Sequence, residues 1–293
     1  MTNISTPFPC AIDRAALKRN LQRARRIAPN IGATDFLARE VDRRMQERLD
    51  YVRLAPQSIL DLGCGEGGHA LAALQTRYPT AACLGIDAEA SLLSAETPGF
   101  FLAADAERLP FAANSFDLVW ANLLLPWLSD PIAMLQEAMR VLKSGGLLMF
   151  SALGHDTLRE LRAGFSDDYA HTQAFIDLHD LGDLLLDAGF VDPVVDMEML
   201  TLTYANLDAL IAELRAAAAT CVMRTRRKSL AGRGVRTRLA AHFEKLRASR
   251  EDGRLPVSAE IVYAHAWKSS GDREQGTGDS MVSVAPIRFM GIR

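Results

Sequence analysis

Apolar and polar positions follow two different patterns through the middle of the chain. Short apolar runs are separated by stretches in which apolar residues recur every three or four positions. Short runs are typical of buried strands, and the longer period is typical of helices. Repeated alternation of the two predicts an α/β protein with a mostly parallel sheet wound on both faces. The predicted strands lie at 58–62, 81–87, 100–105, 116–123 and 146–153, with helices at 67–77, 88–96 and 131–142.

The flanks of this region add helices and two further strands. Leu37, Val41 and Met45 recur at helical spacing, so we expect an amphipathic helix over 37–52, ahead of the first strand. After residue 153 the pattern predicts helices near 156–163 and 178–188, apolar runs over 191–204, basic helices over 206–248 and a returning strand over 259–268.

These elements suggest how the chain is organised. We expect a doubly wound, mostly parallel seven-stranded sheet with a helical insertion before its last strand. The predicted parts are an N-terminal helical extension (1–56), a main domain (57–268) with a basic insertion at about 206–254, and a polar C-terminal tail (269–293).

Composition and charge exclude several classes of protein. Hydrophobic residues make up 49% of the chain, charged residues 24%, and the net charge is −3, which is ordinary for a globular protein. Four separated cysteines without a C-x-x-C pair argue against a disulfide scaffold or a zinc site, and no metal is expected. No apolar run approaches the roughly 18 residues that span a bilayer, so we expect no membrane partner and a cytoplasmic location. Residues 1–34 carry six Lys and Arg against one Asp, and this bias leaves a mitochondrial transit peptide open. Because Ser and Thr are not abundant there, a basic, solvated helix is the preferred interpretation.

A glycine-rich segment follows the first predicted strand. Gly63, Gly65 and Gly68 allow a ligand to approach the backbone closely, and they also satisfy the G-x-G-x-x-G pattern of dinucleotide sites. Asp61 separates the two interpretations, because its carboxylate at the strand end repels a pyrophosphate and attracts an ammonium group. S-adenosylmethionine (SAM) carries an ammonium and a sulfonium but no phosphate, so the charge favours SAM.

Two more aspartates end the next two predicted strands. Asp87 stands where an acid accepts hydrogen bonds from ribose hydroxyls, and Asp105 stands where it can meet an adenine amino group. Each aspartate alone is equally well explained as a helix N-cap. Three acids in register at successive strand ends favour a ligand site.

Residues 58–152 resemble the class I SAM-dependent methyltransferases. The segments DLGCGEGG, GIDAE, ADAERLPF, FDLVWANLLLPWL and RVLKSGGLLMFS carry the resemblance, which implies a Rossmann-like fold and SAM as methyl donor. It also implies the cofactor-binding residues. These are Asp61, Gly63, Cys64 and Gly65 around the methionine moiety, Asp87 with Ala88 at the ribose, Asp105 and Ala106 at the adenine, and Asn122 and Leu123 on the methyl-transfer face.

The flanks resemble the BioC-type malonyl-acyl-carrier-protein O-methyltransferases of biotin synthesis. DFLAREVDRRMQERLDYVRL, FSALGHDTLRELR and DGRLPVSAEIVYAHAWK extend the resemblance over nearly the whole chain. The segments at 152–155 and 215–218 depart from the family pattern. A mitochondrial relative that assists respiratory complex I assembly and hydroxylates arginine shares part of the same motifs. That relative, or a non-catalytic SAM-binding partner protein, is the alternative interpretation.

Methylation of a carboxylate is an in-line displacement on an oxygen that is already ionised, so it needs alignment rather than a general base. A guanidinium suits the acceptor carboxylate, and Arg162 and Arg159 follow the fifth strand, with Arg162 preferred. An arginine on a solvated helix face is the other interpretation of either residue. Trp127 can wall the acceptor side or simply belong to the core.

Residues 215–238 contain eight Lys and Arg and no acidic residue. Such a segment suits a small acidic partner, and we expect acyl carrier protein to dock there. The absence of Phe, Tyr and Trp between Ala205 and His242 removes a stacking platform, so no nucleic acid is expected. The alternative is an ordinary solvated helix face.

Overall fold

A computed structural model describes residues 12–28, 36–66, 68–93, 99–229 and 232–270. Its centre is a seven-stranded sheet in the order β3-β2-β1-β4-β5-β7-β6. The first five strands are mutually parallel, and β7 runs antiparallel to both of its neighbours. The strands are β1 (Ser58–Leu62), β2 (Ala82–Asp87), β3 (Phe100–Ala103), β4 (Phe116–Ala121), β5 (Leu142–Leu153), β6 (Val191–Tyr204) and β7 (Leu255–Trp267).

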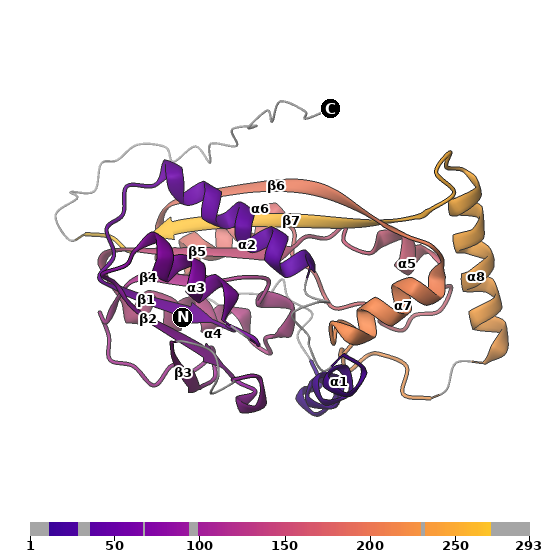
Figure 1. The fold of residues 1–293 in the computed structure, drawn as a ribbon, viewed down its shortest axis with the longest axis horizontal. Coiled ribbons are helices and arrows are strands. Elements are labelled where there is room, and N and C mark those ends of the chain that lie inside the picture. Colours follow the sequence, from indigo (N-terminus) through magenta and orange to yellow (C-terminus); the bar gives the residue numbers. More distant parts are fainter. Residues whose placement is uncertain (1–11, 29–35, 67, 94–98, 230–231, 271–293) are drawn as a thin grey trace.

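Successive strand residues point to opposite faces, and each face is covered by helices. In β1, Ile59 belongs to one buried cluster and Leu60 to the other, as the two-residue period of a strand requires. Helices α2 (Phe36–Arg48) and α3 (His69–Arg77) cover the first face, and α4 (Pro131–Val141) and α6 (Leu178–Asp187) cover the second (Figure 1). The predicted doubly wound, mostly parallel sheet is confirmed.

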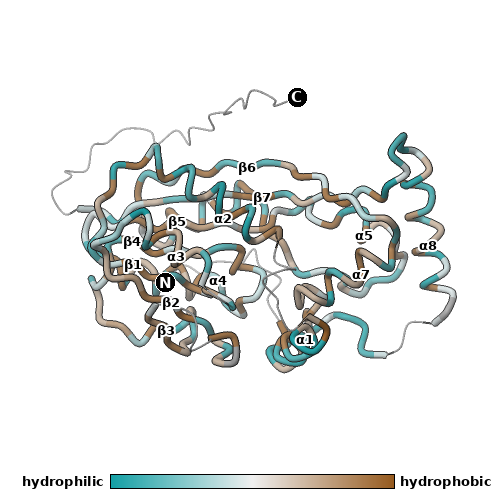
Figure 2. Tube along the Cα trace, in the orientation of Figure 1, coloured by the Kyte–Doolittle hydropathy of each residue, from teal (hydrophilic) through white to brown (hydrophobic). Residues whose placement is uncertain are grey.

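The remaining helices lie where the parallel strands end. They are α1 (Arg14–Ile27), α5 (Arg159–Ala163), α7 (Leu207–Ala216) and α8 (Arg233–Ala248), together with short 3-10 turns at Leu49–Tyr51, Ala90–Leu92 and Leu125–Trp127. Helices α7 and α8 precede β7 and form the predicted insertion (Figure 1). Figure 2 shows α8 as largely hydrophilic, in contrast to the apolar strands of the sheet.

Several predicted boundaries were wrong: β5 begins at Leu142 rather than at 146, and β7 begins at Leu255 rather than at 259. The basic helices expected over 206–248 are α7 and α8, and α7 ends shortly before Ala218, which turns into the left-handed region at φ 55°. The two apolar runs of 191–204 form one long strand, β6. A helix expected over 88–96 appears in the described residues only as the turn at Ala90–Leu92, and part of it lies outside them. Most of the predicted tail (271–293) and residues 1–11 also lie outside the described residues.

Within the part of the chain that the structure describes, every helix is too short or too polar to cross a membrane.

Candidate active site

Asp61 is a buried carboxylate with an unsatisfied oxygen. It lies in β1, is 1% exposed, and its Oδ2 atom has no hydrogen-bond partner. Burial raises the pKa of Asp61 well above its usual value, and the nearby carboxylates of Asp42 and Asp87 add to the shift. A buried acid without a partner is costly. An ammonium group on a ligand would supply a donor to this oxygen.

The loop after β1 turns at two glycines in the left-handed region. Gly63 and Gly65 have φ values of 69° and 61°, which favour glycine. A Cβ on Gly63 would lie 2.7 Å from Cδ1 of Leu124, whereas a Cβ on Gly65 would meet no atom within 4 Å. Burial raises the pKa of the intervening Cys64 thiol, so it remains protonated and unreactive.

Asp87 ends β2 beside this loop. Its Oδ2 accepts a hydrogen bond from Gly65 N at 3.2 Å, and its Oδ1 accepts one from Glu89 N at 2.9 Å. Burial raises the pKa of Asp87, although these two hydrogen bonds oppose the shift. The neighbouring Ala88 is exposed. The Asp87 carboxylate therefore lies at the carboxyl end of β2, where an acid can accept hydrogen bonds from two hydroxyl groups of a ligand.

Asp105 follows β3 and is held from two sides. Oδ1 accepts from Glu107 N at 3.0 Å, and Oδ2 accepts from Nη1 of Arg14 at 2.7 Å. Burial alone would raise the pKa of Asp105, but the hydrogen bonds from Arg14 and Glu107 outweigh it, so the pKa is lowered. Ala106 beside it is buried. The three aspartates therefore lie at the same edge of the sheet, as their spacing predicted.

Asn122 and Leu123 connect β4 to both neighbouring elements. Asn122 Nδ2 donates to Ala38 O of α2 at 2.8 Å, and Asn122 Oδ1 accepts from Ser151 Oγ of β5 at 2.8 Å. Leu123 adopts φ 52°, and its N–H donates to the same Ser151 Oγ at 2.9 Å. These hydrogen bonds hold the loop after β4 against α2 on one side and β5 on the other.

The loop after β5 is attached to β7. Asp156 N donates to Glu260 Oε2 at 2.7 Å, and Thr157 Oγ1 donates to Glu260 O at 3.1 Å. A Cβ on Gly154 would lie 2.3 Å from Cδ of Glu260, so any larger residue there would have to displace the Glu260 side chain. Glu260 lies in a strand far along the chain, and no sequence signal singled it out.

The predicted acceptor arginines start α5 directly after this loop. The Arg162 guanidinium donates to the carbonyls of His155 and Thr157. Arg159 is half exposed and pairs with Asp156 at 3.0 Å and Glu160 at 3.3 Å. Arg162 thus supports the loop itself, and Arg159 forms the helix-surface pair that was its alternative interpretation.

Trp127 is partly buried between two regions that are distant in sequence. It packs against an apolar cluster formed by Ile12 and Ala16 at the start of α1 and by Val222 and Met223 in the insertion. Trp127 therefore joins the start of α1 to the insertion. The sequence did not indicate that α1 packs at this place.

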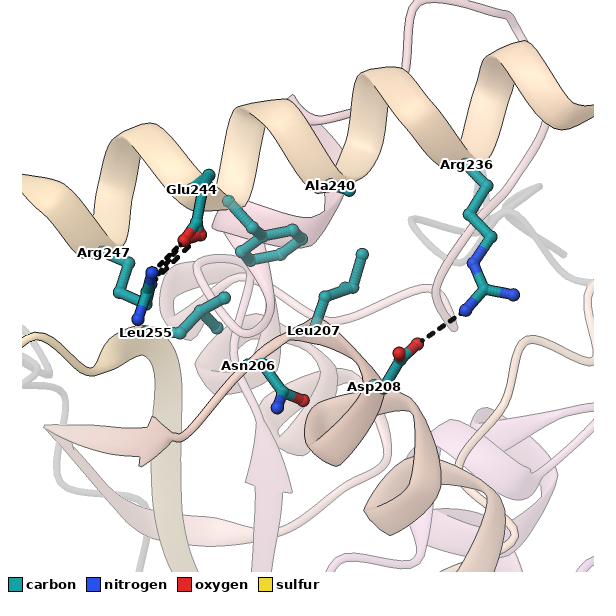
Figure 3. A pocket seen from close by; sticks show the side chains of 9 residues that line it. Asn206, Leu207, Asp208, Arg236, Ala240, Glu244, Arg247 and Leu255 are labelled. Atoms are coloured by element: carbon teal, nitrogen blue, oxygen red, sulfur yellow. Dashed lines mark hydrogen bonds and ion pairs between the residues drawn. The ribbon is translucent and has the colours of Figure 1, made fainter.

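A surface cavity between α7 and α8 lies apart from this edge. Figure 3 shows its rim charges paired with one another, Arg236 with Asp208 and Arg247 with Glu244. These four rim charges therefore neutralise one another. Its lining residues are Asn206, Leu207, Asp208, Arg236, Ala240, Phe243, Glu244, Arg247 and Leu255.

No group of three or more His, Cys, Asp and Glu side chains in the described ranges is arranged to hold a metal ion.

Comparison with known proteins places the chain in a family. A model described as a methyltransferase domain matches residues 60–150. A malonyl-[acyl-carrier protein] O-methyltransferase from Methylovorus sp. (strain MP688) is 42% identical, over 94% of this chain and 96% of the relative. One of the same name from Gallionella capsiferriformans (strain ES-2) is also 42% identical, over 88% of this chain and 91% of the relative.

The fold has solved counterparts. The YcgJ protein from Bacillus subtilis matches with a TM-score of 0.54 at 16% identity, over 80% of this chain and all of YcgJ. Its similarity concerns the fold alone. Together with the strand order, it confirms the Rossmann-like fold of class I methyltransferases. With relatives matched over nearly their whole length, the chain belongs to the malonyl-[acyl-carrier protein] O-methyltransferase family.

Proposed function

We propose that this protein transfers the methyl group of SAM to the free carboxylate of malonyl-acyl carrier protein, giving a methyl ester. The observation that carries this proposal is the similarity to enzymes of that name over almost the entire chain, including the flanks outside the methyltransferase domain. Methylation removes a charge from the acyl end and lets it enter apolar pockets that reject a carboxylate. This chemistry suits the pimeloyl stage of biotin synthesis.

Asp61, Asp87 and Asp105 lie at the carboxyl ends of β1, β2 and β3, and we call this place the cofactor edge. It suits SAM, which supplies a methyl group on a sulfonium. We assign the SAM ammonium to Asp61, whose Oδ2 lacks a partner, and the ribose hydroxyls to Asp87. Asp105 and Ala106 hold the adenine, and Asp105 retains free lone pairs because a carboxylate offers about four acceptor positions. The remaining assigned contacts are Gly63, Cys64, Gly65 and Ala88, with Asn122 and Leu123 on the methyl-transfer face.

The residues of the acceptor side hold the malonyl carboxylate in line with the methyl group. The carboxylate is ionised at neutral pH, so alignment and exclusion of water supply the rate enhancement. We assign the carboxylate to Arg162, with Arg159 as the second candidate. A guanidinium has five N–H donors, and the two carbonyl contacts of Arg162 leave the others for a substrate. Trp127 excludes water from this side.

The carrier docks on the basic segment 215–238. Twelve Lys and Arg and five Asp and Glu lie in 206–254, against 21 and 31 in the rest of the chain. Such a basic region attracts an acidic carrier at a distance. Arg226 and Arg227 are not free for this role, because they pair with Asp13 at 2.8 Å and Asp167 at 3.9 Å. Among the side chains of the segment that the structure describes, the exposed basic ones are Arg215, Arg224, Lys228, Arg236 and Arg238.

We retain the division into an extension (1–56), a methyltransferase domain (57–268) with its insertion at about 206–254, and a tail (269–293). A cytoplasmic location and the absence of nucleic-acid and membrane partners stay predictions.

The proposed function is tested by incubating the full chain with methyl-labelled SAM and malonyl-acyl carrier protein. Acetyl-acyl carrier protein, which lacks the free carboxylate, is the control. We expect base-labile label on the malonyl carrier alone. SAM binding without transfer to any acyl acceptor would instead favour a non-catalytic SAM-binding partner, and oxygen-dependent turnover of an arginine peptide would favour the hydroxylase.

A further inference from the structure

Helix α1 contacts the adenine end of the cofactor edge. Arg14 Nη1 lies 2.7 Å from Asp105 Oδ2, Arg14 Nε donates to Ser129 Oγ at 2.9 Å, and Arg14 Nη2 pairs with Glu107. Near its other end, Arg25 lies 4.0 Å from Glu66 in the glycine loop. Figure 1 shows α1 between the strand ends and the helical insertion. The helix thus lies along the edge assigned to SAM.

The residue before Arg14 attaches α1 to the insertion. Asp13 Oδ2 accepts a hydrogen bond from Arg226 Nη2 at 2.8 Å, and Asp13 N donates to Val222 O at 2.8 Å. Asn20 Nδ2, two turns along α1, donates to Thr220 O at 3.1 Å. The apolar cluster around Trp127 fills the space between these polar contacts.

Asp13 and Arg14 are adjacent, so their positions are linked. Consecutive Cα atoms are about 3.8 Å apart, and Asp13 is also the N-cap of α1, with Oδ1 accepting from Ala16 N at 3.0 Å. A displacement of Asp13 relative to the insertion therefore also displaces the backbone that carries Arg14. The chain contains a continuous path of contacts from Arg226 to the adenine end of the site.

We propose that Asp13 and Arg226 are positioning residues for the cofactor: they hold Arg14 against Asp105 and Glu107, and so couple SAM affinity to the basic insertion. This inference rests on the proposed function, because it takes the cofactor edge as the SAM site. Arg14 supports adenine binding rather than competing with it, since it uses one acceptor position of Asp105 and fixes the orientation of the carboxylate. Linkage is reciprocal, so a carrier bound to the insertion and SAM at the edge alter each other's affinity.

The test is calorimetric titration of SAM into the full chain and its variants. Asp13→Asn removes the charge of the pair but keeps an N-cap side chain, and Arg226→Gln removes the other partner. We expect each to weaken SAM binding about threefold and Arg14→Ala to weaken it about tenfold. The matched control is Arg250→Gln, which breaks an ion pair of 2.7 Å with Asp252 in the same insertion and should leave the affinity unchanged.

Double variants separate positioning from a general loss of structure. Asp13→Asn with Arg226→Gln should lose no more affinity than either alone, and Arg226→Gln should add nothing on the Arg14→Ala background. Melting temperatures of all variants check that the chain stays folded. Unchanged affinity in Asp13→Asn and Arg226→Gln, or tighter binding in Arg14→Ala, would overturn the coupling while SAM binding by the wild type stands. A wild-type chain that binds no SAM would overturn the cofactor site itself, and the coupling with it.

Discussion

The cofactor edge and the basic insertion use charge in opposite ways. At the edge, Asp61 and Asp87 are held at the ends of neighbouring parallel strands, and burial raises the pKa of both. In the insertion, Arg224 and Lys228 are exposed and, within the described residues, form no ion pair. Buried acids bind one small ligand at a fixed geometry, whereas exposed cations attract a large partner over a distance. We therefore expect substitutions at the cofactor edge to change SAM affinity, and substitutions of the exposed cations in the insertion to change activity on the carrier substrate.

The largest expected effect is at Asp61. Asp61→Asn keeps the shape of the side chain but removes the charge that we assign to the SAM ammonium, so SAM affinity should fall about 100-fold, which is roughly 2.7 kcal/mol. Calorimetric titration measures the loss. The ligand-free variant should be more stable than the wild type, because it no longer buries a carboxylate without a partner.

An Asp61→Asn variant that binds SAM within a few fold of the wild type would show that the ammonium lies elsewhere. Lower stability of the ligand-free variant would show that the carboxylate has a structural role.

A substitution at Gly154 tests how closely the loop after β5 packs against β7. Gly154→Ala places a Cβ 2.3 Å from Cδ of Glu260, and overpacking of this kind should lower the free energy of unfolding by about 2 kcal/mol. The control is Gly182→Ala in α6, where a Cβ meets no atom within 4 Å and alanine should stabilise the helix by about 0.5–1 kcal/mol. Urea denaturation of both variants measures the difference, and equal stabilities would contradict the predicted crowding.

Those exposed cations of the insertion that form no ion pair within the described residues should respond through the carrier, unlike Arg226, which contacts the N-cap of α1. Arg224→Glu with Lys228→Glu should lower kcat/KM on malonyl-acyl carrier protein about tenfold, by reversing exposed charge near the docking partner. The kcat/KM on malonyl-CoA and the affinity for SAM should change little. Arg53→Glu, an exposed arginine ahead of β1, is the control for a general effect of charge. Equal losses on both carriers would remove the docking role.

The smallest effect concerns Asp42 on α2, which is 8% exposed and accepts a hydrogen bond from Trp120 Nε1 at 3.1 Å. Burial raises the pKa of Asp42 to about 6, although the hydrogen bond from Trp120 opposes the shift. The folded chain therefore binds this proton more tightly than the unfolded chain, whose pKa is about 3.9. Its stabilising contribution is complete below that value and is lost as the pH rises through about 6.

The loss between pH 5 and pH 7 should be about 1 kcal/mol. Asp42→Asn should remove that part of the pH dependence in urea denaturation, and an unchanged slope would show that Asp42 is ionised throughout.

Much of the cofactor edge was predictable because it follows from local order in the chain. Parallel strands place their ends on one edge, so Asp61, Asp87 and Asp105 had to meet there once the strands were recognised. The strand order and the antiparallel β7 agree with the class I methyltransferase fold that the motifs implied.

The contacts of α1 and the insertion were not predictable in the same way. Arg226 belonged to a basic segment that suggested a free surface, yet it pairs with Asp13, which lies 213 residues earlier. Arg14 looked like part of a basic, solvated helix, but it holds Asp105. Spacing along the sequence carries information about neighbours on one helix or strand, and these pairs join elements brought together only by the complete fold.

A crystal structure of the chain with S-adenosylhomocysteine tests the assigned site most directly. We predict the ligand amine within hydrogen-bond distance of Asp61 Oδ2, the ribose hydroxyls on Asp87, and the adenine beside Asp105 and Ala106 with Arg14 in place. A ligand bound elsewhere, for example in the cavity between α7 and α8, with Asp61 still unpartnered, would contradict the account.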